Sequence, residues 1–291
     1  MPIGISIKDL KVRSLDVDFN EISWRYGDTM DDVLAYTLQV LRCESPEGPF
    51  EPVSPAFEDR NRFIDNAILI EDKWRQYYYR LRLTSKETGE FEDTPVVAKE
   101  PEPDLMALEI RRHIQILFRE HAGRRLWVLP ARSSGQRCEC WSPRLGQRTR
   151  SGCPLCYDTG YIRGYYYPIE VFGQIDPSPK ANQSGNAGAM QQTDTTGRFP
   201  DYPPLKPDDI IVELENRRWR VVTVTATEKA RAVVHQEVQL HEIPRTDIEY
   251  SIPLKMEQAM KDLWASPPRN FVNPHNMQAI DERIAAMYRT K

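Results

Sequence analysis

The chain has 291 residues, which is enough for two or three small domains. It is 40% hydrophobic and 28% charged, and its mean hydropathy is −0.61, values typical of domains with limited cores. No segment approaches the roughly 18–20 consecutive apolar residues of a membrane helix, and a net charge of −4 excludes a global attraction to nucleic acid. We therefore expect no membrane partner.

Residues 1–98 alternate apolar and polar side chains in short segments. The pattern is clear in residues 15–19, 22–26 and 36–42, and turn-forming clusters such as residues 44–49 separate the segments. Short strands at this spacing over about one hundred residues predict an antiparallel β-sandwich.

Details of this first segment resemble a fibronectin type III domain. Trp24 lies in an I-x-W context in the second expected strand, and residues 77–83 read YYYRLRL, similar to the family's sixth strand. The phrase LQVLRCESPEGPFEPVSP is similar to the third strand and the turn after it. The resemblance implies a spacer or an adhesive surface that carries no chemistry of its own. Cys43 is interpreted as a thiol in the core or at a strand end.

Residues 99–125 are predicted to be a linker followed by a helix. Asp104 can cap a helix that runs to about His121, and Gly123 can end it. A wide apolar stripe at helical spacing favours packing on the domain that follows. His113 and His121 could serve as metal ligands, but solvated histidines on the flank of a helix are the favoured interpretation.

Residues 126–175 are predicted to form a zinc-binding module and a β-hairpin. Four cysteines form two close pairs twelve residues apart, a spacing that suits a structural, tetrahedral zinc site made of Cys138, Cys140, Cys153 and Cys156. Gly146 is the expected turn between the pairs, and Gly160 the expected positive-φ exit. The second pair, in Cys-Pro-x-Cys before Thr-Gly, resembles the knuckles of DnaJ-type and other treble-clef zinc modules.

Two other interpretations of the cysteines remain open, namely two disulfides or unrelated buried thiols. No signal peptide is recognised before the first strand pattern, so the thiols are expected to stay reduced, and a cluster of reduced thiols favours metal. A catalytic zinc would keep one position open to solvent. Four sulfur ligands leave none, so the predicted ion is structural.

The remainder of the chain is predicted to complete a small β-domain. Residues 176–204 are rich in Ser, Gly, Asn, Gln, Thr and Pro, and are expected to form a long flexible loop. Residues 205–250 form a three-stranded meander that, with an aromatic strand pair at residues 161–172, makes a small barrel or sandwich. Residues 251–291 are a C-terminal arm with two short helices, which should dock on this protein or on a neighbouring subunit.

The fold class is therefore mainly β and multidomain: a fibronectin III-like sandwich, a central helix with a four-cysteine zinc-ribbon-like loop, a small β-barrel or sandwich, and a helical arm. Arginines gather around the zinc loop, with eleven between residues 111 and 163 and no lysine. They could form an interface with acidic faces of neighbouring copies, contact nucleic acid, or make a solvated face. The favoured interpretation is an interface that involves Trp141, Arg144, Arg148, Arg150 and, in the C-terminal arm, Trp264.

No catalytic motif is recognised in the sequence. There is no G-x-S-x-G nucleophile turn, no phosphate-binding glycine loop and no H-E-x-x-H pair. Asp208 and Asp209 are interpreted as part of a turn leading into a strand and not as a carboxylate pair. The chain is therefore predicted not to be an enzyme.

The order of these segments resembles the neck proteins of tailed bacteriophages, which connect the head portal to the tail. The phrase K-P-x-D-I-I…R-W-x-V at residues 206–221 is similar to phage head–tail connector and stopper domains. The resemblance implies a structural virion protein, assembled in the host cytoplasm as a homo-oligomeric ring. Its implied partners are other virion proteins, either portal or adaptor on one side and tail terminator or tube on the other. DNA would pass through without specific binding.

Two alternatives to the neck protein remain. The first is a zinc-containing nucleic-acid-binding protein that uses Trp141, Arg144, Arg148 and Arg150. The second is a protein that attaches a tail or baseplate component.

Overall fold

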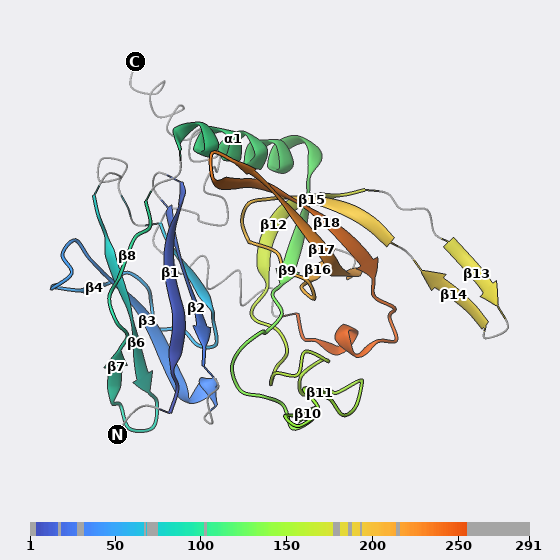
Figure 1. Ribbon diagram of the computed structural model, residues 1–291, viewed down its shortest axis with the longest axis horizontal. Coiled ribbons are helices and arrows are strands. Elements are labelled where there is room, and N and C mark those ends of the chain that lie inside the picture. Colours follow the sequence, from blue (N-terminus) through green and yellow to red (C-terminus); the bar gives the residue numbers. More distant parts are fainter. Residues whose placement is uncertain are drawn as a thin grey trace, which may run out of the picture.

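The computed structural model describes most of the chain up to Leu254, namely residues 4–16, 19–27, 32–66, 68, 75–101, 104–176, 181–185, 188–192, 194–213 and 216–254. This part is mainly β, as predicted, with several sheets, one α-helix and a closed six-stranded barrel (Figure 1). None of its helices is long and apolar enough to cross a membrane. The predicted helices of the C-terminal arm, with Trp264, lie outside the described residues.

The N-terminal unit consists of two antiparallel sheets. The first has the order β1-β2-β5, with β1 (Ile7–Asp16), β2 (Phe19–Tyr26) and β5 (Arg62–Asp65). The second has the order β4-β3-β6-β7, and an additional short strand, β8, also pairs with β6. Its strands are β3 (Tyr36–Cys43), β4 (Glu51–Pro52), β6 (Tyr78–Ser85), β7 (Phe91–Asp93) and β8 (Val97–Ala98).

A single apolar core joins these two sheets. Alternation along β6 buries every second side chain, as expected for a strand with one face on a core. Trp24 is buried and stacks on Phe57 with ring centroids 5.9 Å apart. The hydroxyl of the buried Tyr79 on β6 donates to Asp65 of β5 at 2.9 Å and accepts from Asn20 of β2 at 2.9 Å. This polar bridge fixes the two sheets in one register.

The predicted central helix is present as α1 (Leu105–Ile116), which continues as a π-helical turn (Leu117–Ala122). The Asp104 side chain caps it by accepting from the Met106 backbone N–H at 2.7 Å. The helix lies across β15 and β18 of the barrel, as expected from its apolar positions (Figure 1). The buried face, however, runs through Ala107, Leu108 and Arg111, whereas Leu105 is 61% exposed.

The second unit is a closed barrel with the strand order β12-β15-β18-β17-β16-β9. Side chains from all six strands fill its core, including the buried Trp219 and Phe199. The barrel alternative of the sequence prediction is therefore correct. Its strands are β9 (Arg124–Leu129), β12 (Ile169–Ile175), β15 (Asp194–Pro200), β16 (Ile210–Val212), β17 (Arg218–Lys229) and β18 (Ala232–Glu242).

The prediction of a long flexible loop over residues 176–204 is wrong for much of that range. It contains a two-stranded hairpin, β13 (Ala181–Gly185) and β14 (Gly188–Gln192), and the barrel strand β15. In β15 only Thr195, Gly197 and Phe199 alternate inward, so the composition gives a weak strand signal. The Phe199 ring fills the space above two glycines, since a Cβ on Gly173 or Gly197 would lie 2.5 or 2.8 Å from it.

The aromatic segment at residues 161–172 also differs from its prediction. A regular strand begins only at Ile169, while Tyr161 and Tyr165 form isolated bridges with Arg137 and Ala131. The first strand of the meander, expected from residue 205, is confined to β16. The Lys206–Asp209 turn occupies the start of that range.

One buried ion pair and a more exposed one join the sandwich to the barrel unit. Arg132, just after β9, bonds the Asp59 carboxylate in the sandwich, and both side chains are less than 10% exposed. Arg163 pairs with Asp32 and also reaches Asp59 at 3.3 Å. Tyr166 extends into the sandwich core itself. The two β units therefore share one packed junction.

Candidate metal centre

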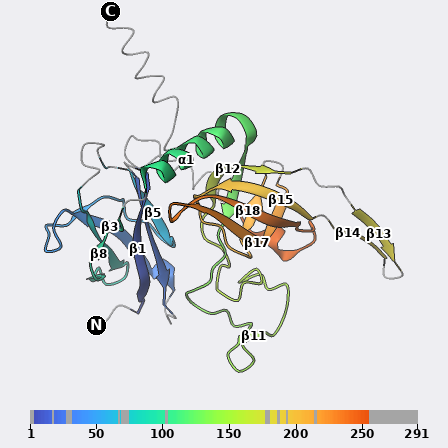
Figure 2. The ribbon, with the colours of Figure 1, turned by 45° about the horizontal axis from the view of Figure 1, so that its top comes forward.

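The four clustered cysteines lie on an excursion between two neighbouring barrel strands. Strands β9 and β12 pair with each other along residues 124–128 and 169–173, and the chain leaves the barrel between them. The excursion hangs from one end of the barrel and carries a small hairpin, β10 (Trp141–Ser142) and β11 (Gln147–Arg148) (Figures 1 and 2). We call residues 130–168 the cysteine loop.

The structure brings all four predicted cysteines together. Their Sγ atoms lie within 4.8 Å of one another, and each side chain is at most 3% exposed. The closest pairs, Cys140–Cys156 and Cys138–Cys153, are 3.4 and 3.8 Å apart, far longer than a disulfide bond of about 2.0 Å. Four thiolates about 2.3 Å from a tetrahedral zinc ion lie about 3.8 Å from each other. The cluster is therefore a possible metal site, and neither predicted alternative of disulfides or scattered thiols describes it.

Two glycine turns present the cysteine pairs to each other. Gly146, with φ of +63°, closes the β10–β11 hairpin, whose Thr149 N–H donates to the Cys140 carbonyl at 2.8 Å. Gly160 adopts φ of +80° after the second pair, and a Cβ there would lie 3.0 Å from the Trp141 ring. Both glycines were expected at these turns. Positive φ and close ring contact together explain why glycine is required at residue 160.

Cys140, Cys153 and Cys156 differ in the pKa of their thiols. Burial alone would raise the pKa of the Cys153 thiol, but bonds from the backbone N–H groups of Leu155 and Cys156 outweigh it and lower that pKa to about 6. Burial raises the pKa of Cys140 and of Cys156. Of these three cysteines, Cys153 is therefore best able to offer a thiolate at neutral pH.

Asp158 holds the backbone next to Cys153 in place, a role that the sequence analysis missed. Its carboxylate accepts from the backbone N–H groups of Gly152 at 3.0 Å and Cys153 at 3.2 Å, and it pairs with Arg148 at 3.2 Å. These bonds fix the turn that presents Cys153. The signal was an Asp shortly after the second cysteine pair, where a short side chain can cap a turn.

An arginine between two aromatic rings covers the side of the loop. The Arg137 guanidinium lies 4.0 Å from the ring centroids of both Trp141 and Tyr161. Trp141 is half-buried in this stack, and Arg137 itself is exposed. The sequence analysis assigned Trp141 to an interface but did not anticipate its stacking partner.

The other predicted interface arginines lie on the same loop with different surroundings. Arg144 is exposed in the β10–β11 turn, and Arg148 is bound to Asp158. Arg150 places a guanidinium nitrogen 3.7 Å from the Cys153 sulfur. Several other arginines of the basic segment are used within the chain: Arg132 and Arg163 at the junction, and the buried Arg111 beside Asp201 at 3.2 Å. The positive charge is therefore only partly available at the surface.

The two helical histidines are not part of the cluster. His113 is exposed on α1, with its ring Nδ1 2.9 Å from the Glu109 carbonyl, and His121 is exposed in the π-helical turn. Within the part of the chain that the structure describes, the cluster of potential metal ligands consists of the four cysteines. The solvated interpretation of both histidines agrees with this placement.

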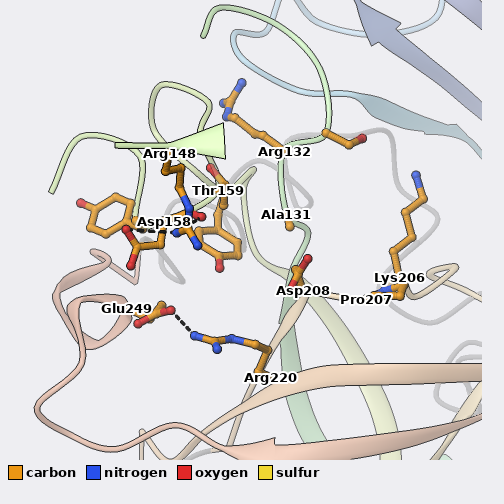
Figure 3. A pocket seen from close by; sticks show the side chains of 13 residues that line it. Ala131, Arg132, Arg148, Asp158, Thr159, Lys206, Pro207, Asp208, Arg220 and Glu249 are labelled. Carbon is orange, nitrogen blue, oxygen red and sulfur yellow. Dashed lines mark hydrogen bonds and ion pairs between the residues drawn. The ribbon is translucent and has the colours of Figure 1, made fainter. Parts of the chain in front are cut away.

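A polar cavity of about 270 Å³ separates the cysteine loop from the barrel end (Figure 3). Two ion pairs line it, Arg148 with Asp158 on the loop and Arg220 with Glu249 on the barrel side. Each of these charges already has an opposite charge beside it on its own wall of the cavity.

The Lys206–Asp209 turn forms another wall of this cavity, and it is the turn that the sequence predicted. The buried Asp209 accepts from the backbone N–H groups of Ala131 and Lys206, each at 2.8 Å. Burial raises the pKa of the Asp209 carboxyl to about 6. Asp208 adopts φ of +72° beside it, as a turn residue. The Asp209 carboxylate therefore fixes this turn.

No protein-family model matches the sequence, and no curated protein matches it. Among solved structures, a chain from the virion of a native gene transfer agent (GTA) particle is similar to this one. The match covers 43% of this chain and 98% of the other, with 14% sequence identity and a TM-score of 0.28.

Proposed function

We propose that the chain is a non-enzymatic structural component of a virion of the tailed-phage type, located in the neck that joins head to tail. In this proposal it is assembled in the host cytoplasm as a homo-oligomeric ring. One side would contact portal or adaptor proteins, and the other would contact the tail terminator or tube. The observation that carries the proposal is the closed and buried cluster of four cysteines.

A closed cluster supports a structural role because of its ligands. Four thiolates around one Zn²⁺ satisfy its coordination and leave no position for a substrate, in contrast to a catalytic site. Zn²⁺ bound by Cys138, Cys140, Cys153 and Cys156 would stiffen a loop with little apolar core of its own, since only Ile162 packs against the cysteines there. A stiff loop at one end of a barrel is suited to serve as an assembly joint.

The N-terminal sandwich would act as a fibronectin III-like module fixed to the barrel and its cysteine loop. Support comes from its two sheets, with β1, β2 and β5 in one and the remaining strands in the other, and from the buried Trp24 between them. The buried Arg132–Asp59 pair would keep the module at a fixed angle to the barrel. A rigid body with a protruding hairpin suits a ring whose subunits meet through defined surfaces.

The experiment for the neck proposal has two parts. Native mass spectrometry of the purified, zinc-loaded full chain should give one multiple of the monomer mass and one zinc per chain. Electron microscopy of particles from the producing cell should then place this ring between head and tail. Particles that contain the chain elsewhere, or that lack it, would contradict the neck assignment.

A second candidate function is nucleic-acid binding by the cysteine loop. The Arg137 stack between Trp141 and Tyr161, with the exposed Arg144 beside it, offers both cationic and aromatic groups. Binding of duplex or single-stranded DNA at physiological salt, with a steep salt dependence that Arg144→Ala and Arg137→Ala both reduce, would favour this function over the ring. Salt-independent or undetectable binding would leave the structural role.

A further inference from the structure

Strand β17 lies between β18 and β16 and is much longer than β16. β16 pairs with it only from Arg218 to Arg220, and the adjoining turn adds one more pair of backbone bonds at Val221. From Val222 to Lys229 the strand pairs with β18 on one side, and no other described strand lies against its second side. A barrel that is otherwise closed therefore keeps one open edge.

This edge has few of the features that natural proteins use to block an exposed strand. Residues 222–227 read VTVTAT, without charge or proline, and this segment is exposed except for the half-buried Val224. Register shifts at Val222 and between Thr227 and Glu228 interrupt the ladder at either end. Between them, residues 223–227 form a regular and β-prone segment that can accept another strand.

The hairpin β13–β14 also has strand edges without a partner strand among the described residues. Its two strands have five residues each, pair with each other, and pair with no other strand in the part of the chain that is described. Both views draw the hairpin beyond the barrel wall (Figures 1 and 2). An isolated two-stranded hairpin is at best marginally stable in water. The strand sequences, ANQSG and GAMQQ, also lack charge and proline, so their edges are open as well.

We propose that the β13–β14 hairpin of one copy adds to the open edge of β17 in a second copy, and that this strand addition links successive subunits. The inference rests on the self-assembly part of the proposed function and names the contact that produces it. A hairpin strand of five residues matches the regular segment at residues 223–227 in length, so the addition can pair the backbone groups of that segment that point away from β18. Because donor and acceptor are different surfaces, the contact can repeat head-to-tail from subunit to subunit, and it closes a ring when the rotation between subunits permits.

Mixed cross-linking tests the contact directly. One protein carries Thr225→Cys and a second, of different mass, carries Gln183→Cys or Gln191→Cys, both zinc-loaded and in a Cys43→Ser background. We expect a disulfide-linked heterodimer to form at least about tenfold faster than in a control mixture of the same hairpin variants with Glu87→Cys, because the contact raises the local thiol concentration. Equal rates in both mixtures would overturn the inference.

Deletion of the hairpin separates this inference from the ring proposal. A chain in which residues 181–192 are replaced by a short Gly-Ser linker should keep its zinc content and circular dichroism but lose its oligomeric mass. If the deletion variant still assembles, self-assembly stands and strand addition is wrong. If the unmodified full chain remains monomeric, both are wrong. A cross-link from Thr225→Cys to a cysteine placed within residues 255–291 of the same chain would also overturn the inference, since that segment would then occupy the edge.

Discussion

The four cysteine sulfurs lie at the centre of the cysteine loop, which has little apolar core of its own. Cys153→Ser should abolish stoichiometric zinc binding and unfold residues of the loop, since structural zinc in small modules contributes about 10–16 kcal/mol. Elemental analysis and thermal unfolding measure the two effects. Cys43→Ser is the matched control, because Cys43 lies outside the cluster and should leave zinc content unchanged. Full zinc occupancy in the Cys153 variant would show that the metal site is elsewhere.

Asp158 acts through Cys153 without touching the proposed ion. Asp158→Ala removes the acceptor for two backbone N–H groups, and we expect zinc affinity to fall about 10–100-fold, as for other residues that orient metal ligands. Competition with a chromophoric chelator measures the affinity. Glu139→Ala, at an exposed position between two of the cysteines, is the control and should bind zinc normally. Equal affinities in both variants would remove the positioning role.

Asp209 should make stability depend on pH in the acidic range. Its pKa is raised to about 6 by burial, so the folded protein holds this proton more tightly than the unfolded chain. The resulting stabilisation is complete below the ordinary pKa of a carboxyl group near 4, and it is lost as the pH rises through about 6.

In Asp209→Asn this titration is absent. Between pH 4 and pH 6.5 the wild type should therefore lose up to about 3 kcal/mol of unfolding free energy that the variant does not lose. The difference, variant minus wild type, should become more positive by that amount. Urea unfolding of both proteins across this range measures the difference. A difference that is constant with pH would contradict the raised pKa, whatever its absolute size.

At the scale of elements, β15 shows where sequence reasoning fails. Long strands with regular alternation, such as β3 and β6, could be predicted, because one stripe of each is continuously apolar. In β15 the inward positions are Thr195, Gly197 and Phe199, and only one of these is strongly apolar. The strand exists because its partners β12 and β18 supply the remaining core, which local composition cannot reveal.

The glycines of the barrel wall provide a test of this packing. Gly197→Ala would place a Cβ 2.8 Å from the Phe199 ring, and such overpacking costs about 1–3 kcal/mol. Thermal or urea unfolding measures the loss. The double variant Gly197→Ala/Phe199→Leu should lose less than the sum of the two single variants, because the smaller side chain relieves the clash. Additive losses would show that the two residues do not compete for the same space.

The cysteine cluster could be predicted because its ligands come in two pairs that are local in sequence. Its surroundings could not be predicted in the same way. Asp59 and Arg132 meet at the junction although they lie 73 positions apart. The local sequence around either residue does not indicate its partner. The sequence analysis therefore interpreted the arginines as an external surface, whereas several of them bind acids of the same chain.

At the scale of the whole molecule, the Arg132–Asp59 pair controls how the two β units unfold. Asp59→Asn leaves a buried guanidinium without its main counter-charge, and breaking a buried pair in this way costs about 3–5 kcal/mol. We expect a lower unfolding midpoint and separate transitions for the sandwich and barrel, measured by calorimetry. Arg82, which binds the more exposed Asp93, provides the control variant Arg82→Gln, expected to cost at most about 1 kcal/mol. A single transition in the Asp59 variant would show that other contacts couple the units.

Both ends of the cysteine loop are anchored in the sandwich, by Arg132 on the side of β9 and by Arg163 and Tyr166 on the side of β12. An ion held by the thiols would therefore stiffen the segment between these two anchored ends. Removing the ion with a chelator should loosen the loop between these anchors while the sandwich and barrel stay packed at their junction, so small-angle scattering should record a modest rise in the radius of gyration. Binding of one ion would then set how stiff this end of the subunit is.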